Sequence, residues 1–207
     1  ANNVLANYKS VPQTSASAIT AVQQSIGQAY FLRAFSYYYL VRWFGPLPNI
    51  TTEIDITARP NRAPADTIYN TIIGDLNQAA SLLPATFPGA PGRATSGAAR
   101  SLLADVYLTM TGWPLNQTQY YAKAAAEADS VMTAGVYSLE PDFATVFTTN
   151  NGPESIFALQ FDVSAGVPER SYGSSSVPLD ESGLDGSGGW DDYYPEINFY
   201  LNSPKCY

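Results

Sequence analysis

The chain has 207 residues, of which 45% are hydrophobic and 13% aromatic, so it can bury a core and does not have the composition of a disordered protein. Ten basic against eighteen acidic residues give a net charge of -8, which argues against a surface that binds the phosphates of nucleic acids. With no His and a single cysteine, Cys206, zinc and iron-sulfur sites built on His and Cys are excluded, as is an internal disulfide.

The first predicted elements are a short helix over residues 1–8 and, after a polar loop, one long helix. The long helix is expected to begin near Ser15 or Ser17 and to end at Phe44, because Gly45-Pro46 suits the position after a helix and cannot continue it.

The second half of this long helix, Ala29 to Phe44, is the most apolar stretch of the chain. Only three of its sixteen residues are neither apolar nor aromatic, so no wide polar face remains and the helix is predicted to be buried on all sides. Truncating Phe35 or Leu40 to Ala is therefore expected to cost about 2–5 kcal/mol. The stretch is too short for a membrane span, and Arg33 and Arg42 would lie within it.

A further helix is predicted to start at Asp66 as its N-cap and to end before Pro84. Its apolar positions follow the helical period, and the residues expected to face the core are Ile68, Tyr69, Ile72, Ile73, Leu76, Ala79 or Ala80, and Leu83.

Two more helices follow, one capped by Thr95 and one over Gln119 to Thr133 that closes at Gly135. The inner face of the latter is predicted to carry Tyr120 or Tyr121, Ala124, Ala128, Val131 and Met132, and Trp113 is predicted to be a wedge between helices. Helices of similar length joined by short turns indicate a mostly α fold of tetratricopeptide-like pairs, although no clean repeat of that signature is present.

From Tyr137 onward the sequence pattern is no longer that of paired helices, and Phe143 and Phe147 indicate a packed loop. Ser155–Phe161 alternates well enough to predict a short strand, and no regular element is predicted from Asp162 to Gly189. The predicted domains are a helical scaffold over residues 1–149 and the start of a loop-rich, ligand-facing lobe over residues 150–207.

Candidate binding residues lie in this last segment. Trp190, Tyr193 and Tyr194 follow a glycine run and could present ring faces to a sugar; the alternative is a small hydrophobic cluster that holds the loop. Nearby acids could suggest a glycosidase pair or a calcium loop, but they lack a fixed spacing and are expected to be solvated charge: Asp180, Glu181, Asp185, Asp191 and Asp192. No catalytic residue, metal ligand or cofactor site is therefore predicted, with calcium kept as the alternative.

Four segments in chain order carry a resemblance: Leu32-Arg33-Ala34 through Leu40-Val41-Arg42 to Gly45-Pro46-Leu47-Pro48; Arg93-Ala94-Thr95 with the helix to Leu108; Tyr121-Ala122 to Phe147; and Glu154-Ser155-Ile156-Phe157 with Gln160-Phe161. Together they resemble the SusD/RagB family of outer-membrane nutrient-binding lipoproteins. Ser96 departs from the pattern, since the family usually has Lys there, which puts one polar contact in doubt.

The resemblance implies a non-catalytic, cell-surface protein that binds glycan and hands oligosaccharides to a SusC-like, TonB-dependent outer-membrane transporter. It implies that the chain is truncated at both ends and that a signal sequence and lipidated Cys precede Ala1. The matched segments are scaffold, not binding motifs. Two other functions stay open, a protein-interaction adaptor on tetratricopeptide-like helices and, less favoured, a glycoside hydrolase; the identity of the glycan or other nutrient is open as well.

Overall fold

The computed structural model describes residues 1–54 and 57–160. The chain divides into two units, residues 1–159 and 160–207, and the features below belong to the first. Its helices are α1 (Asn2–Asn7), α2 (Ala16–Phe44), α3 (Ala65–Leu82), α4 (Ser96–Thr111), α5 (Tyr121–Thr133) and α6 (Phe143–Thr148), with short 3-10 turns at η1 (Tyr8–Ser10) and η2 (Thr118–Tyr120).

Capping residues set most of the helix boundaries as the sequence predicts. The Ser15 hydroxyl accepts the Ala18 N–H at 3.2 Å and starts α2. The Thr95 hydroxyl accepts the Ala98 N–H at 3.1 Å and starts α4. Gly45, at φ 65°, ends α2 in a conformation that disfavours other residues.

The start of α3 differs from the prediction. The helix begins at Ala65 after Pro64, and Asp66 lies in the first turn instead of at the cap. Pro64 has φ -55°, near the value fixed by its ring, so it leads directly into a helix. The Asp66 carboxylate still lies at the positive end of the helix dipole, and it accepts a hydrogen bond from the Gln117 amide at 3.0 Å.

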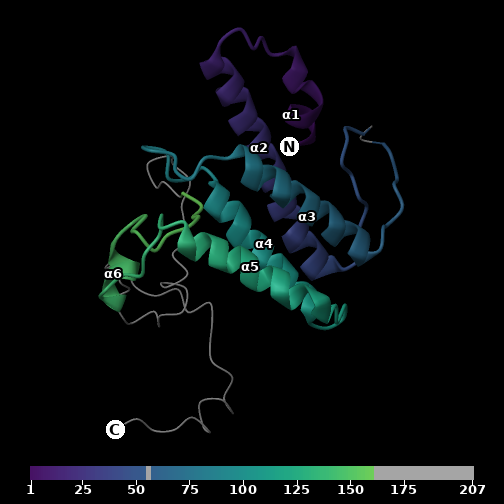
Figure 1. The fold of residues 1–207 in the computed structure, drawn as a ribbon. Coiled ribbons are helices and arrows are strands. Elements are labelled where there is room, and N and C mark those ends of the chain that lie inside the picture. Colours follow the sequence, from purple (N-terminus) through teal and green to yellow (C-terminus); the bar gives the residue numbers. More distant parts are fainter. Residues whose placement is uncertain (55–56, 161–207) are drawn as a thin grey trace, which may run out of the picture. The chain divides into compact units, whose positions relative to one another are not determined.

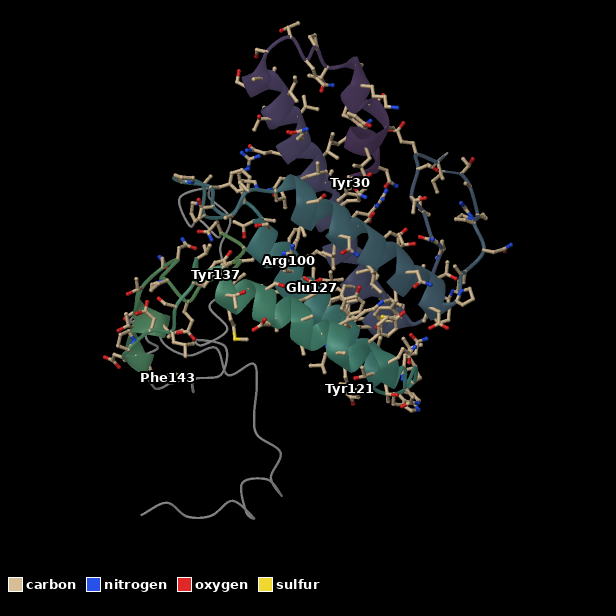
Figure 2. All side chains as sticks on the ribbon, in the orientation of Figure 1. Tyr30, Arg100, Tyr121, Glu127, Tyr137 and Phe143 are labelled. Carbon is tan, nitrogen blue, oxygen red and sulfur yellow. The ribbon has the colours of Figure 1, made fainter. Side chains whose placement is uncertain are left out.

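Successive helices pack as neighbours, α2 on α3, α3 on α4 and α4 on α5 (Figure 1). This arrangement confirms the mostly α fold of paired helices. An ion pair of 2.8 Å joins Arg100 of α4 to Glu127 of α5 across one of these contacts (Figure 2). The largest side chains that are almost fully buried between the helices are Phe31, Tyr38, Ile68, Ile72, Leu76, Leu103, Val106 and Met110.

Burial of α2 on all sides, as predicted, is wrong. One face is buried and carries Val22, Gly27, Ala29, Phe31, Ala34, Tyr37, Tyr38 and Val41. The opposite face leaves Leu32, Tyr39, Leu40, Trp43 and Phe44 exposed. The amino-acid composition of a helix shows how little polar surface it has. It does not show whether other elements pack on both faces of the helix.

Several peripheral side chains also differ from prediction. Trp113 is 87% exposed and therefore is not a wedge between helices. On α5, Ala124 and Val131 face the core as predicted, whereas Ala128 and Met132 are exposed because a 13-residue helix packed mainly on α4 has only a narrow inner face. Phe143 is exposed on α6, so the predicted packed loop is wrong at that position.

No strand forms over residues 155–160 of the predicted strand, and Phe161 lies outside the described residues. A strand needs a partner backbone. Residues 1–54 and 57–160 contain only an isolated bridge, between Leu47 and Ala63. Ile156 and Phe157 instead pack against the helical core, where the Phe157 ring meets that of Phe31 at 4.9 Å between centroids.

Within the described chain, no helix is long and apolar enough to cross a bilayer.

Candidate functional site

The predicted ring platform of Trp190, Tyr193 and Tyr194 and the acidic residues beside it lie outside the described residues. Among the described side chains, no group of three or more His, Cys, Asp or Glu could hold a metal ion. Within the helical unit, two hollows offer candidate binding geometry.

A cavity of about 260 Å³ lies beside the start of α4. The loop before the helix contributes Phe87 and Arg93, and the chain after α5 contributes Tyr137 and Ser155. The described residues of its lining combine a guanidinium, hydroxyl groups and apolar surface, and none of them is a carboxylate. The cavity is thus suited to bind a small polar ligand.

Hydrogen bonds fix the wall of this cavity. The Gln28 amide of α2 donates to the Ala94 carbonyl at 2.6 Å and accepts the Ala94 N–H at 3.1 Å. Next to Ala94, the Thr95 hydroxyl shares a hydrogen bond of 2.8 Å with the Tyr137 hydroxyl. A glycine at position 97 allows this approach, since a Cβ there would lie 2.6 Å from the Tyr137 ring. The cavity wall is therefore fixed by hydrogen bonds from Gln28 on one side and Tyr137 on the other, without a ligand.

Among the described residues that line the cavity, the charged side chain is Arg93. Its guanidinium carbon lies 4.3 Å from the centroid of the Phe87 ring, a stacked cation-π contact. Within the described part of the chain this guanidinium has no ion pair or hydrogen bond, so its N–H donors are available to a ligand. From the sequence, Arg93 was predicted to belong to the scaffold. The residue that orients it by stacking, Phe87, lies six positions away and belongs to no recognised motif.

A larger hollow of about 740 Å³ lies between the start of α1, the middle of α2 and residues 50–54. Arg33 is part of its wall and makes four side-chain hydrogen bonds. Its Nε and Nη2 donate to the two carboxylate oxygens of Asp75 at 2.7 Å each, and Nη1 donates to the Asn2 side chain at 2.9 Å and the Thr51 carbonyl at 2.8 Å.

The hydrogen bond to Asp75 is the main reason that the pKa of Arg33 is raised above its usual value, against the opposing effect of burial. With four of its five N–H donors in these hydrogen bonds, Arg33 is a structural clamp between α1, α2, α3 and the loop.

A sequence model of the SusD-like family, described as starch-binding and associating with the outer membrane, matches residues 1–108. The chain belongs to the SusD-like family. SusD-like protein P2 of Formosa agariphila is 34% identical over 193 residues, which cover 84% of this chain and 35% of that protein.

Solved structures agree with this assignment. A SusD superfamily protein from Parabacteroides distasonis superposes with a TM-score of 0.70 at 33% identity, over 84% of this chain and 39% of that one. A structure with bound xylogluco-oligosaccharide gives 0.69 at 26% identity, over 91% and 38% of the two chains. A laminarin-binding SusD-like protein gives 0.63 at 27% identity, over 75% and 34%.

The chain spans about a third of the length of the curated SusD-like relatives that it matches. The resemblance recognised in the four sequence segments is thereby confirmed, as is the helical fold. The family is described as associating with the outer membrane.

Proposed function

We propose that this chain is part of a non-catalytic protein that binds glycans at the cell surface. The observation that supports this most is family membership combined with solved SusD-like structures of the same fold whose descriptions name sugars, a xylogluco-oligosaccharide in one and laminarin in another. The two sugars differ, so we leave the glycan class open.

The proposal includes localisation and a partner. The protein acts as a surface-exposed lipoprotein, held by a lipid anchor outside the 207 residues, and passes bound oligosaccharides to a SusC-like, TonB-dependent transporter. The family description supports the outer-membrane location. The transporter partnership follows from the resemblance to SusD.

Two groups of residues form the proposed sugar contacts. Trp190, Tyr193 and Tyr194 supply rings on which the apolar face of a sugar can lie, with little loss of side-chain entropy. The cavity beside α4 supplies the Arg93 guanidinium as a donor, next to the Tyr137 hydroxyl that is hydrogen-bonded to Thr95. Neither group requires a metal, so treatment with a chelator is expected to leave glycan retention unchanged, in contrast to the calcium alternative.

Replacement of Trp190 by Ala tests the ring contact. Retention on an immobilised glycan is expected to weaken by about 1–3 kcal/mol with an almost unchanged melting temperature. Trp113→Ala is the matched control, because Trp113 is an exposed Trp on the helical unit, and it is expected to leave retention as it is. A lower melting temperature with unchanged retention in Trp190→Ala would show that Trp190 is structural.

The adaptor function remains the second candidate, because α2 has an exposed apolar face of the kind that binds another protein segment. Binding of peptides but of no glycan would favour it. Release of reducing ends from a glycan by the purified protein would instead favour the glycoside hydrolase.

A further inference from the structure

The turn that follows α6 contains an Asn-Gly pair, Asn151 and Gly152, and both residues line the cavity beside α4. No other Asn in the 207-residue sequence is followed by Gly. Asn151 is exposed and has φ 54°, in the left-handed region that Asn tolerates better than most residues. The backbone conformation of this turn therefore favours Asn at position 151.

The small size of Gly152 suits the packing of the same turn. A Cβ at position 152 would lie 2.6 Å from Oε1 of Glu140, so a larger residue would have to displace that carboxylate. The segment around Glu140 is held here by two hydrogen bonds: the Glu140 N–H donates to the Glu154 carboxylate at 3.1 Å, and the Ser138 N–H donates to the Pro153 carbonyl at 3.2 Å. The Asn-Gly pair thus has a structural reason at each of its two positions.

An Asn-Gly pair permits an intramolecular reaction that a Cβ at the second position hinders. Gly152 has no Cβ, and within the described residues its N–H makes no hydrogen bond, so its nitrogen can approach the Asn151 side chain. The nitrogen loses its proton to solvent and attacks Cγ of Asn151. The bond from Cγ to the side-chain nitrogen then breaks, and ammonia leaves. Water opens the resulting cyclic imide at either carbonyl, which gives aspartate or isoaspartate.

The product changes the charge of the cavity. Among the described residues that line it, the charged side chain is Arg93, whose guanidinium makes no ion pair or hydrogen bond in the described part of the chain. We propose that Asn151 is a site of spontaneous deamidation that places a carboxylate in the same cavity as Arg93. The new carboxylate offsets the guanidinium charge as the protein ages. This inference does not depend on glycan binding.

Incubation of the protein in mildly alkaline buffer, followed by peptide mass spectrometry, tests the reaction. Asn116 is the matched internal control, because it is also exposed and has φ 52° but is followed by Gln117. We expect the mass increase of an amide converted to an acid at position 151 at least about tenfold faster than at position 116, with aspartate and isoaspartate products. Asn151→Gln should abolish it. Equal rates at the two positions would overturn the proposal.

Asn151→Asp tests the effect on the cavity, because it reproduces the aspartate product. In isotope-labelled protein, we expect the Nε–H NMR signal of Arg93, assigned with Arg93→Lys, to shift in Asn151→Asp. The same signal should stay in place in Asn116→Asp, which adds an equal charge outside the cavity. An Arg93 signal that does not move in Asn151→Asp would overturn the effect on the cavity.

Discussion

Arg33 and Asp75 join α2 to α3 through two parallel hydrogen bonds of 2.7 Å, with side chains that are only 10% and 6% exposed. The same guanidinium holds Asn2 of α1 and the Thr51 carbonyl, so three elements and a loop meet at one cation. A paired charge in this position is costly to remove singly, because its partner stays buried and uncompensated.

Replacement of Asp75 by Asn is therefore expected to lower the free energy of unfolding by about 3–5 kcal/mol, measured by urea denaturation. The matched control is Glu127→Gln, which breaks the more exposed pair with Arg100 and is expected to cost less than about 1 kcal/mol. Equal, small losses in both variants would show that the Arg33 clamp does not support the fold.

Burial along α2 gives a second prediction. Phe31 is 1% exposed and its truncation to Ala should cost about 3–5 kcal/mol, since it removes ring contacts and leaves a cavity. Leu40 lies on the exposed face of α2, so Leu40→Ala in the 207-residue chain should cost less than about 1 kcal/mol. This value replaces the larger loss expected from sequence. A loss of stability at Leu40 as large as that at Phe31 would mean that this face of α2 is covered within the chain.

Gly97 supplies a prediction for the wall of the cavity. Gly97→Ala places a Cβ 2.6 Å from the Tyr137 ring and should destabilise the fold by about 1–3 kcal/mol while it disrupts the hydrogen bond between Thr95 and Tyr137. In a Tyr137→Ala background the same substitution should cost nothing, which a double-mutant cycle measures. Gly74→Ala is the control: no atom lies within 4 Å, and the helix should gain up to about 1 kcal/mol. An additive cycle would disprove the contact.

Tyr38 links stability to alkaline pH. Burial raises the pKa of its phenol, as it does for Tyr69 and Tyr107, so these groups stay protonated in the fold when the unfolded chain ionises at a pH of about 10. The contribution of these tyrosines to the free energy of unfolding is complete below a pH of about 10. It is lost as the pH rises toward their raised pKa values in the folded protein.

The midpoint of urea unfolding should accordingly fall between pH of about 9 and 11. The urea midpoint of Tyr38→Phe should be lower at neutral pH, because the variant loses the hydrogen bonds to Asp105 and Thr109. It should, however, decrease less steeply as the pH rises. Identical pH slopes in the two proteins would contradict the shifted titration of Tyr38.

The helices and their core were predictable because the signals are local. The hydroxyls of Ser15 and Thr95, the glycine at position 45 and the period of the apolar residues in α3 act within a few residues of the chain. The predictions that were wrong depend on residues far away in the sequence. Burial of Trp43 and Trp113 requires another element to cover them, and a strand at Ser155 requires a second strand beside it.

The candidate site was harder to predict for the same reason. Arg93 and Tyr137 were visible as parts of scaffold motifs, but their meeting at one cavity depends on a fold that brings together residues about forty positions apart. The Arg33 clamp joins residues forty-two positions apart, and the apolar sequence around Arg33 gives no sign of Asp75. Trp190, Tyr193 and Tyr194 stay a prediction.

The most direct test of glycan binding without catalysis is calorimetric titration of the protein with oligosaccharides from starch, xyloglucan and laminarin, followed by chromatography of the recovered sugars. We predict saturable binding of at least one oligosaccharide, with every sugar recovered at its original length. Absence of binding to all members of a wider panel of neutral and acidic glycans, or recovery of shortened products, would contradict a non-catalytic glycan-binding protein.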